Sequence, residues 1–319
     1  MKKILYVVHR YAPYPGGSEN YVRDMAEETQ KRGNHVAVFA GSHMGDLNGV
    51  YLSSDPNIIA HDWDLIVVHG GDVAVQDFAI NNAANIRSPM LFMLIVPSES
   101  QTYVNGLQNC KYIGCSTEED WDFVRSKGDI VLSKSVQIRH GIDIPNSLGT
   151  EGFKQKYGIT TKYMFLSCGG YWPNKAMPDL VNVFNQTHRR DITLVLTGYE
   201  GGFGLPPSSD IVKPFVIEDR RDVMSAIKEA DMYIMHSYKE GFGLVLLESM
   251  ANRTPWMARE LAGARLMKDY GFTYNTNNEL LNNINNFQPV SDQLIENAYN
   301  HLIQEHSIQC TVDDILKIA

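Results

Sequence analysis

Short, almost continuous apolar runs alternate with polar stretches of helical length along the first part of the chain. Strands that are buried on both faces of a sheet carry such runs, whereas half-exposed strands alternate apolar and polar residues. The pattern therefore predicts a parallel sheet with helices on both faces. The predicted strands are ILYVV (4–8), HVAVFA (35–40), LIVVH (65–69), MLFMLI (90–95), KYIGC (111–115) and VQIRH (136–140).

The stretch between the first two strands predicts the first of these helices. SENYVRDMAEETQKRG (18–33) has acidic residues early and Lys31 and Arg32 in its last turn, which is the order that the helix dipole favours. Ser18 is the expected N-cap. Gly33 is expected to end the helix, because glycine tolerates the left-handed backbone of a helix terminus.

A second series of the same kind begins near residue 163. Its strands are expected at YMFLSC (163–168), ITLVLTG (192–198), IVKPFVI (211–217) and MYIMHS (232–237), with helices between them. Two successive βα series imply an α/β protein of two doubly wound, Rossmann-like domains, whose ligands bind beyond the carboxyl ends of the strands. We expect an N-terminal, acceptor-side domain at 1–145, a donor domain at 146–300, and a helix at 301–319 that packs back toward the first domain.

The composition narrows the class of protein. Of 319 residues, 44% are hydrophobic and 20% are charged, as in globular proteins, and the apolar runs are too short to span a bilayer. The four cysteines are scattered without a CxxC pair, which favours free thiols and a cytoplasmic location. The net charge of −9 is spread over both halves, so charge gives no support to a nucleic-acid or anionic-membrane partner.

Two glutamates flank a glycine-rich turn before an apolar helix in HSYKEGFGLVLLESMANRTP (236–255). Gly241 and Gly243 let backbone N–H groups approach an anion, and a helix that begins near Gly243 adds partial positive charge. Glu248 would then lie about a turn and a half below the anion, in reach of a ribose diol. Glu240, in the loop, would reach the other side of the phosphates. By spacing alone, a solvated Glu240 followed by a buried helix is the more common arrangement.

Three weaker features lie at other strand ends. Lys175 opens a helix in FLSCGGYWPNKAMPDLVNVF (165–184), where the dipole disfavours a cation unless an anion is bound; a solvated lysine is the alternative. Gly16 and Gly17 form a second anion-tolerant loop, although many strand–helix loops contain two glycines. His69 ends a strand, where a histidine is more often structural than catalytic. The sequence has no phosphate-loop lysine motif, no nucleophile elbow and no Cys/His metal spacing.

Together these features resemble the family 4 retaining glycosyltransferases, which have the GT-B fold of two Rossmann-like domains facing across a cleft. EGFGLVLLESMANRTP resembles the family's E-x7-E signature, and GGYWPNK resembles its donor-phosphate loop. In the first domain, YPGGSENYVRDMAEETQKRGNHVAVFAG resembles the opening glycine loop, helix and strand, and IRHGIDIP resembles the link between the domains. The resemblance covers nearly the whole chain and is most specific in the second domain.

The resemblance implies an enzyme that moves a sugar from a UDP- or GDP-linked donor to an acceptor hydroxyl with retention of configuration. Glu248 would bind the ribose, Lys175 the diphosphate and Glu240 the donor sugar. The implied catalytic residues are Glu240, Lys175 and His69. The implied donor-binding residues are Gly16, Gly17, Gly170, Gly241, Phe242, Gly243, Leu244 and Glu248. The implied acceptor is a carbohydrate, a lipid-linked sugar or another hydroxyl compound.

No metal and no cofactor are expected, and the nucleotide sugar is a co-substrate. Charge develops on the leaving phosphate, and fixed N–H dipoles with a lysine stabilise it without reorganisation. A front-face reaction, in which the leaving phosphate helps to deprotonate the acceptor, is what the family resemblance implies.

The chain departs from the family pattern in several places. Gly170 stands where the family has an arginine beside the lysine, and His236-Ser237 stands where it has Pro-Ser. The candidates to replace the arginine are Tyr171, Trp172 and a residue from elsewhere such as Arg265. The first domain is also short, and because that domain shapes the acceptor site, the acceptor is the least transferable feature.

Two other functions fit the same fold. A sugar-nucleotide epimerase would need acid/base groups in the first domain, where His69 is the one clear candidate. A non-catalytic nucleotide-sugar binder is the second alternative, and Gly170 motivates it.

Overall fold

The described structure divides into two compact units. The computed structural model describes residues 1–14, 16–41, 45–47, 50–71, 75, 84–169, 173–198, 204–206, 210–217 and 219–319. Unit 1 comprises Met1–Asp143 together with Glu305–Ala319, and unit 2 comprises Ile144–Gln304. The sequence analysis placed the boundary after residue 145 and a terminal helix at 301–319. Each unit has its own sheet and its own apolar core.

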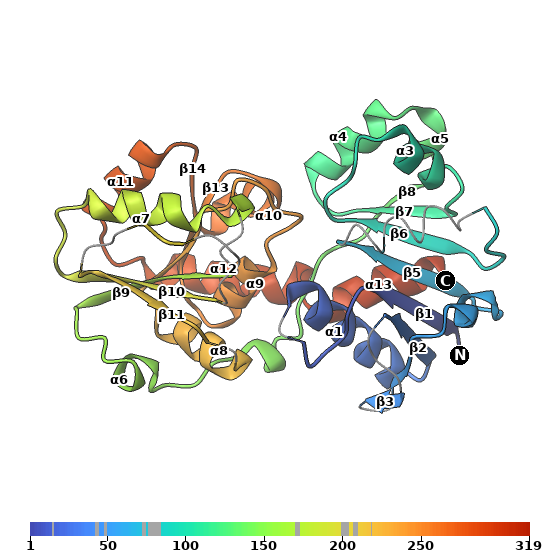
Figure 1. Ribbon diagram of the computed structural model, residues 1–319, viewed down its shortest axis with the longest axis horizontal. Helices are drawn as coiled ribbons and strands as arrows, with labels where there is room; N and C mark the ends of the chain where they lie inside the picture. The colour runs from blue at the N-terminus through green and yellow to red at the C-terminus, as the bar shows by residue number, and fades with distance from the viewer. Residues whose placement is uncertain are drawn as a thin grey trace. The chain divides into compact units, whose positions relative to one another are not determined.

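Unit 1 is built on a sheet with the strand order β3-β4-β2-β1-β5-β6-β7-β8 (Figure 1). Neighbouring strands run parallel, except that β3 is antiparallel to β4. β1 lies in the middle and is buried along its length after Lys3, as its continuous apolar run predicts. The strands are β1 (Lys3–Val8), β2 (His35–Ala40), β3 (Gly45–Leu47), β4 (Val50–Ser53), β5 (Leu65–Gly70), β6 (Met90–Leu94), β7 (Tyr112–Cys115) and β8 (Ser135–Gln137).

The helices of unit 1 include one from the far end of the chain. They are α1 (Gly17–Lys31), the 3-10 turn η1 (Pro56–Ala60), α3 (Gln101–Leu107), α4 (Glu118–Ser126), α5 (Asp129–Leu132) and α13 (Ile308–Ile318). Arg139 holds α13 in place, because its Nε and Nη2 donate to the two carboxylate oxygens of Asp314, each at 2.8 Å. Burial would raise the pKa of Asp314, but the hydrogen bonds from Arg139 outweigh it and lower that pKa.

The start of α1 differs from the expected one. The helix begins at Gly17 with Gly16 as its N-cap, and no side chain caps it, so Ser18 is not the N-cap. The physical reason is that the Gly16 carbonyl already accepts the backbone N–H of Asn20 at 3.1 Å and Asn20 Nδ2 at 2.8 Å. The other end is confirmed: α1 ends at Lys31, and Gly33 has a φ of +82°.

Unit 2 is built on an all-parallel sheet with the order β11-β10-β9-β12-β13-β14. In Figure 1, α7 and α11 lie on one face of this sheet and α8 lies on the other. The strands are β9 (Tyr163–Cys168), β10 (Ile192–Thr197), β11 (Val212–Phe215), β12 (Met232–Met235), β13 (Trp256–Arg259) and β14 (Phe272–Tyr274). The helices and turns are η2 (Pro145–Ser147), α6 (Phe153–Lys156), η3 (Pro173–Lys175), α7 (Met177–Asn185), α8 (Arg220–Glu229), α9 (Leu244–Ala251), α10 (Ala262–Leu266), η4 (Lys268–Tyr270), α11 (Asn277–Asn285) and α12 (Asp292–Glu305).

The structure confirms the expected fold class of two doubly wound α/β sheets. Two predicted element boundaries differ from the observed ones. Lys175 does not open the helix, because it ends the 3-10 turn η3 and α7 begins at Met177, after Ala176 with a φ of 51°. The last strand expected in unit 1, at 136–140, ends at Gln137, since Arg139 turns toward Asp314.

Candidate functional site

The carboxyl ends of two neighbouring strands bring the predicted residues of unit 2 together. β9 and β12 pair in parallel, so the loops that follow them leave the sheet at the same edge. A backbone hydrogen bond from Tyr238 N to Asn174 O, 2.7 Å long, joins the two loops. The turn that carries Lys175 and the loop that carries Glu240 therefore form one continuous surface.

Lys175 and Glu240 form an ion pair on this surface. Lys175 Nζ lies 2.5 Å from Glu240 Oε1, and the Ser237 hydroxyl donates to the same oxygen at 2.6 Å. The side chains are 28% and 12% exposed, so water screens this pair less than it screens a pair on the open surface. A lysine just before a helix needs an anion nearby to offset the helix dipole. In this structure, the carboxylate of Glu240 does so.

Gly243 shapes the start of α9 beside that pair. Its φ is +93°, and a Cβ at this position would come within 2.8 Å of Met235 Sδ, so glycine is required for both reasons. No side chain caps α9, and its first turn carries no acidic residue. The first N–H groups of a helix lack partners within the helix, so this end of α9 offers donors and partial positive charge to a ligand.

Phe242, one of the expected donor-binding residues, is buried. Its side chain is 4% exposed, and its carbonyl accepts the backbone N–H of Gly263 at 3.1 Å. A Cβ at Gly263 would come within 2.5 Å of that carbonyl oxygen, so α10 packs tightly against the loop. Phe242 therefore anchors the loop through its buried ring and its carbonyl.

Glu248 lies in the second turn of α9 and pairs with an arginine that the sequence analysis missed. Arg220 Nη2 donates to Glu248 Oε1 at 2.7 Å, and the side chains are 27% and 14% exposed. Arg220 is the first residue of α8, where the dipole disfavours a cation, and the same signal drew attention to Lys175. The signal was therefore present in the sequence, but the partner on another helix was not visible there.

Tyr233 of β12 is hydrogen-bonded to the end of the neighbouring strand β9. The Tyr233 hydroxyl is hydrogen-bonded to the backbone N–H of Cys168 at 3.2 Å. Burial, followed by the Cys168 thiol, raises the pKa of Tyr233 above its usual range, and the charges of Glu240 and Glu248 both add to the rise.

A buried polar network lies behind the loop, at the position where the family resemblance expects proline. His236 Nε2 lies 3.2 Å from Arg259 Nη2 and 3.5 Å from Asp179 Oδ2, and Nδ1 lies 2.7 Å from the Tyr274 hydroxyl oxygen. Burial, helped by Arg259, lowers the pKa of His236 to about 4, so the ring is neutral at pH 7. Asp179 accepts from the Tyr238 hydroxyl at 2.5 Å, which ties the loop to α7.

The predicted residues of unit 1 lie at two of its strand ends. Gly16 is the N-cap of α1, and a Cβ there would overlap Glu19 Oε2 at 1.9 Å, whereas a Cβ at Gly17 would meet nothing within 4 Å. Arg10 Nε binds the Glu19 carboxylate at 3.1 Å. His69 is the last residue but one of β5, is 4% exposed and meets the Tyr21 ring edge-on, with 5.8 Å between the ring centroids. Burial lowers the pKa of His69 to about 4, so it is neutral at pH 7.

The proposed replacements for the missing arginine are only partly covered by the structure. Gly170, Tyr171 and Trp172 lie outside the described residues. Arg265 is half exposed and binds within its own loop region, since its Nη2 donates to the Glu260 carbonyl at 3.1 Å.

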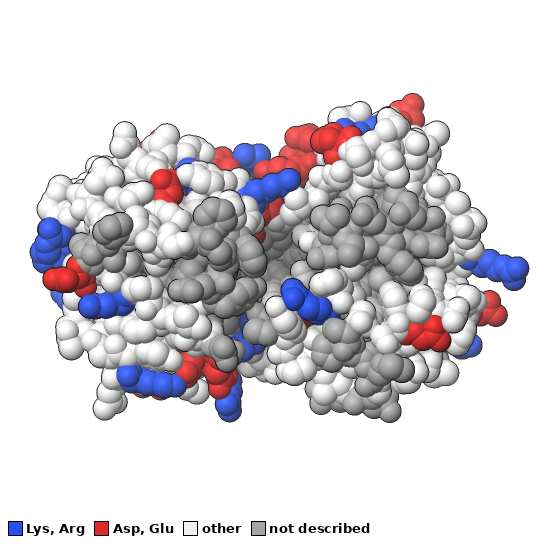
Figure 2. Space-filling model, viewed as in Figure 1, with Lys and Arg blue, Asp and Glu red and all other residues white. Residues whose placement is uncertain are grey.

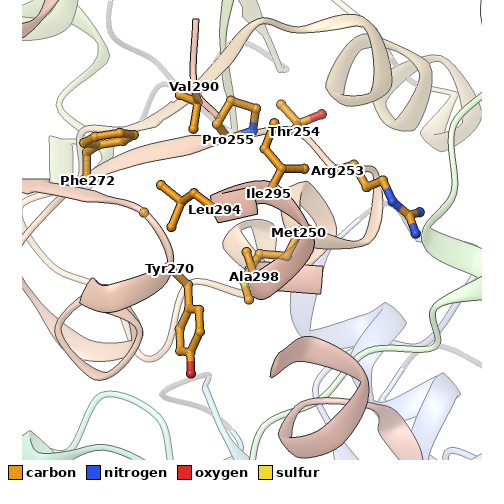
Figure 3. A pocket seen from close by; sticks show the side chains of 11 residues that line it. Met250, Arg253, Thr254, Pro255, Tyr270, Phe272, Val290, Leu294, Ile295 and Ala298 are labelled. Atoms are coloured by element: carbon orange, nitrogen blue, oxygen red, sulfur yellow. The ribbon is translucent and has the colours of Figure 1, made fainter. Parts of the chain in front are cut away.

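An apolar cavity lies elsewhere in unit 2, and none of the predicted site residues lines it. Its lining includes Leu294 and Ile295 from α12 and Phe272 from β14 (Figure 3). Arg253 is its one charged neighbour, and its guanidinium turns away toward Glu296 at 2.7 Å. A phosphate or sugar needs polar groups that converge on it, and this cavity lacks them.

Surface charge, metal-binding clusters and membrane-spanning helices were each considered as signs of another function. On the face shown in Figure 2, Lys and Arg side chains stand singly among acidic ones and do not form a basic patch. No group of three or more His, Cys, Asp or Glu side chains suited to a metal ion occurs among the residues that the structure describes. In that same part of the chain, we found no helix that is long and apolar enough to cross a membrane.

Comparison with known proteins agrees with this geometry. Residues 162–294, which lie in unit 2, match the model of the family described as glycosyl transferases group 1. No curated protein matches the chain significantly in sequence.

Several solved structures have the same fold. HepE of Anabaena in complex with UDP-glucose superposes with a TM-score of 0.79 at 19% identity, over 100% of both chains. Sucrose-phosphate synthase from Thermosynechococcus elongatus gives 0.81 at 15% identity, over 100% of this chain and 98% of that one. The catalytic domain of starch synthase IV from Arabidopsis thaliana, bound to ADP and acarbose, gives 0.73 at 12% identity, over 99% and 98%. The chain therefore has the GT-B fold of two Rossmann-like domains.

Proposed function

We propose that this protein is a family 4 glycosyltransferase that transfers a hexose from a UDP- or GDP-linked donor to an acceptor hydroxyl, with retention of configuration and without a metal ion. The observation that carries the proposal is the Lys175–Glu240 ion pair at the loop before α9, with Glu248 in the second turn of the same helix. A cation, two carboxylates and the backbone donors of a helix start suit the diphosphate, sugar and ribose of such a donor. The family match of residues 162–294 supports the same assignment.

Different residues of unit 2 would bind different parts of the donor. Lys175 Nζ and the amides of Gly243 and Leu244 would bind the diphosphate, which carries the growing negative charge as the bond to the sugar breaks. Glu240 would accept hydrogen bonds from the donor sugar. Because Lys175 and Glu240 already contact each other at 2.5 Å, their charges would be placed for donor phosphate and sugar hydroxyls at once.

In a single displacement, retention requires that the acceptor oxygen attack the face that the diphosphate leaves. In the front-face reaction, the bond from the anomeric carbon to the phosphate oxygen breaks, the bond to the acceptor oxygen forms, and the acceptor proton passes to the leaving phosphate. Glu240 would hold the sugar during this step and is not assigned as a covalent nucleophile. The roles of Gly16, Gly17 and His69 in the donor site remain part of the proposal.

Donor turnover tests the proposal. The protein is incubated with UDP-, GDP- and ADP-sugars, and release of the nucleoside diphosphate and the fate of the sugar are followed with and without sugar acceptors. We expect transfer, or slow hydrolysis, with at least one donor, and loss of both in Glu240→Ala. NMR of the product then reports its anomeric configuration.

The same assay separates the alternative functions. Conversion of one nucleotide sugar into its epimer would indicate an epimerase. Binding without transfer or hydrolysis would indicate a non-catalytic binder, and it would be seen as thermal stabilisation of ~2.7 kcal/mol at 100 times the Kd. His69 is a weak candidate for the acid/base chemistry of an epimerase, since its pKa of about 4 leaves it without a proton to donate from a cationic ring at pH 7.

A further inference from the structure

Arg220 is a charged group at the proposed site to which neither the family resemblance nor the reaction assigns a role. It stands at the first position of α8, and its Nη2 donates to Glu248 Oε1 at 2.7 Å. A cation at a helix N-terminus is disfavoured by the dipole, and a carboxylate that is 14% exposed loses much of its hydration. Each charge therefore offsets part of the cost of the other.

The contact with Arg220 uses one of the two oxygens of the Glu248 carboxylate. A carboxylate has two oxygens and about four acceptor positions, and Arg220 occupies Oε1. Oε2 accepts no hydrogen bond from the residues that the structure describes. Glutamate has three side-chain torsions, so without a second contact its carboxylate would rotate. A guanidinium fixed on one oxygen leaves the other one presented in one direction.

We propose that Arg220 is the positioning residue for Glu248: it holds Oε1 so that Oε2 is presented to the ribose diol of the donor, and it thereby sets the preference for ribonucleotides. This inference rests on the proposed function, in which Glu248 binds the ribose. Because Glu248 is assigned to the ribose and not to the transferred sugar, the effect of Arg220 is expected in nucleotide binding.

The neighbouring arginine provides a matched control. Arg221 is 91% exposed, and its Nη2 binds Asp219 Oδ2 at 2.8 Å on the surface. It shares the first turn of α8 and the charge of Arg220, but no contact joins its side chain to Glu248 within the described residues. Arg221→Ala therefore removes one positive charge from the same helix end and leaves the Glu248 contact in place.

The test compares nucleotides with and without the diol. Kd values are measured by calorimetry for UDP, GDP and ADP and for their 2′,3′-dideoxy counterparts, with wild type, Arg220→Gln, Arg220→Lys, Glu248→Gln and Arg221→Ala. Wild type and Arg221→Ala should favour a ribonucleotide by at least ~10-fold, since a hydrogen bond to a charged group is worth about a factor of ten or more. Arg220→Gln should bring that ratio close to one while the dideoxy affinity changes little, and Arg220→Lys should retain part of it.

The outcomes distinguish failure of the inference from failure of the proposed function. If Arg220→Gln weakens both nucleotide forms equally, or leaves the ratio as it is in wild type, Arg220 does not act through Glu248. The double variant Arg220→Gln/Glu248→Gln should show the same ratio as Glu248→Gln alone, and a further loss would contradict a shared role. If wild type binds none of the nucleotides, the proposed function itself fails. Unchanged dideoxy binding and thermal unfolding show that each variant is folded.

Discussion

The two units each place a glycine-flanked helix start beside a strand end, and the two helix starts differ in charge. α1 follows Gly16 and carries Glu19 in its first turn, with the carboxylate packed against the glycine. α9 follows Gly243 and has neither an acidic first turn nor a side-chain cap. The partial positive charge at the start of α1 thus has an acidic side chain of the same helix beside it, whereas the first turn of α9 has none. The doubly wound fold does not set this difference, since a few side chains at each strand end decide it.

The largest effect is expected from the ion pair beside α9. Lys175→Ala removes the cation that would offset the leaving diphosphate, and Glu240→Gln removes the carboxylate that would hold the sugar, so kcat/KM should fall roughly 10²- to 10³-fold for each. Steady-state kinetics with the donor found in the turnover screen measures this. Lys156→Ala is the control, because Lys156 forms a similar pair with Asp222 at 2.5 Å but is 57% exposed. A comparable loss in Lys156→Ala would show that the effect is structural.

The second prediction compares the two helix starts directly. Gly243→Ala should cost about 1–3 kcal/mol of unfolding free energy, because a φ of +93° strains an L residue and Cβ would meet Met235 Sδ at 2.8 Å. Gly17→Ala should be neutral or stabilising by up to ~1 kcal/mol, since a Cβ there has open space and alanine favours a helix. Urea unfolding measures both. Equal destabilisation of the two variants would remove the structural contrast between α1 and α9.

The sequence predicted the strands that are buried on both faces, because their apolar runs are long enough to stand out. It did not predict β13 (Trp256–Arg259) or β14 (Phe272–Tyr274), which are short, and Arg259 and Thr273 interrupt the apolar pattern. Such strands form because they pair with an existing neighbour, and pairing between distant segments leaves no periodic signal.

The same reasoning explains what could be predicted of the candidate site. Glycines and charges near strand ends have a local signal, so Lys175, Glu240, Gly243 and Glu248 could be named as candidates from the sequence. Spacing alone favoured a structural reading, and the family resemblance supplied the functional one. Their partners lie far away in the sequence: Arg220 precedes Glu248 by 28 positions, and Lys175 precedes Glu240 by 65. Only the packing of the helices and strands brings these charges within hydrogen-bond distance.

The third prediction concerns His69, the buried histidine near the end of β5 in unit 1. Burial lowers the pKa of His69 from 6.5 to about 4, so between these values the unfolded chain binds a proton that the folded chain does not. Its contribution to stability is therefore complete above pH ~6.5 and is lost as the pH falls toward 4, with a total of roughly 3 kcal/mol. His69→Gln should flatten the fall of Tm with acidification in calorimetry, whereas His61→Gln, at an exposed position, should leave it unchanged. An unaltered slope in His69→Gln would mean that this ring is not held neutral by burial.

The smallest effect is expected from metal removal, and it tests how the charge at the end of α9 is used. If Lys175 and the free amides of α9 supply the positive charge for the diphosphate, EDTA should change kcat/KM by less than about twofold, and added Mg²⁺ or Mn²⁺ should not restore activity to Lys175→Ala. A loss of activity in EDTA that returns with Mg²⁺ would place the compensating charge on an ion. This result bears on the comparison with α1. If a metal ion offset the charge of the diphosphate, the start of α9 would not differ from the start of α1 in the way that we propose. Donor kinetics in EDTA, with and without restored metal, therefore test whether Lys175 and the amides of α9 offset the charge of the diphosphate without a metal ion.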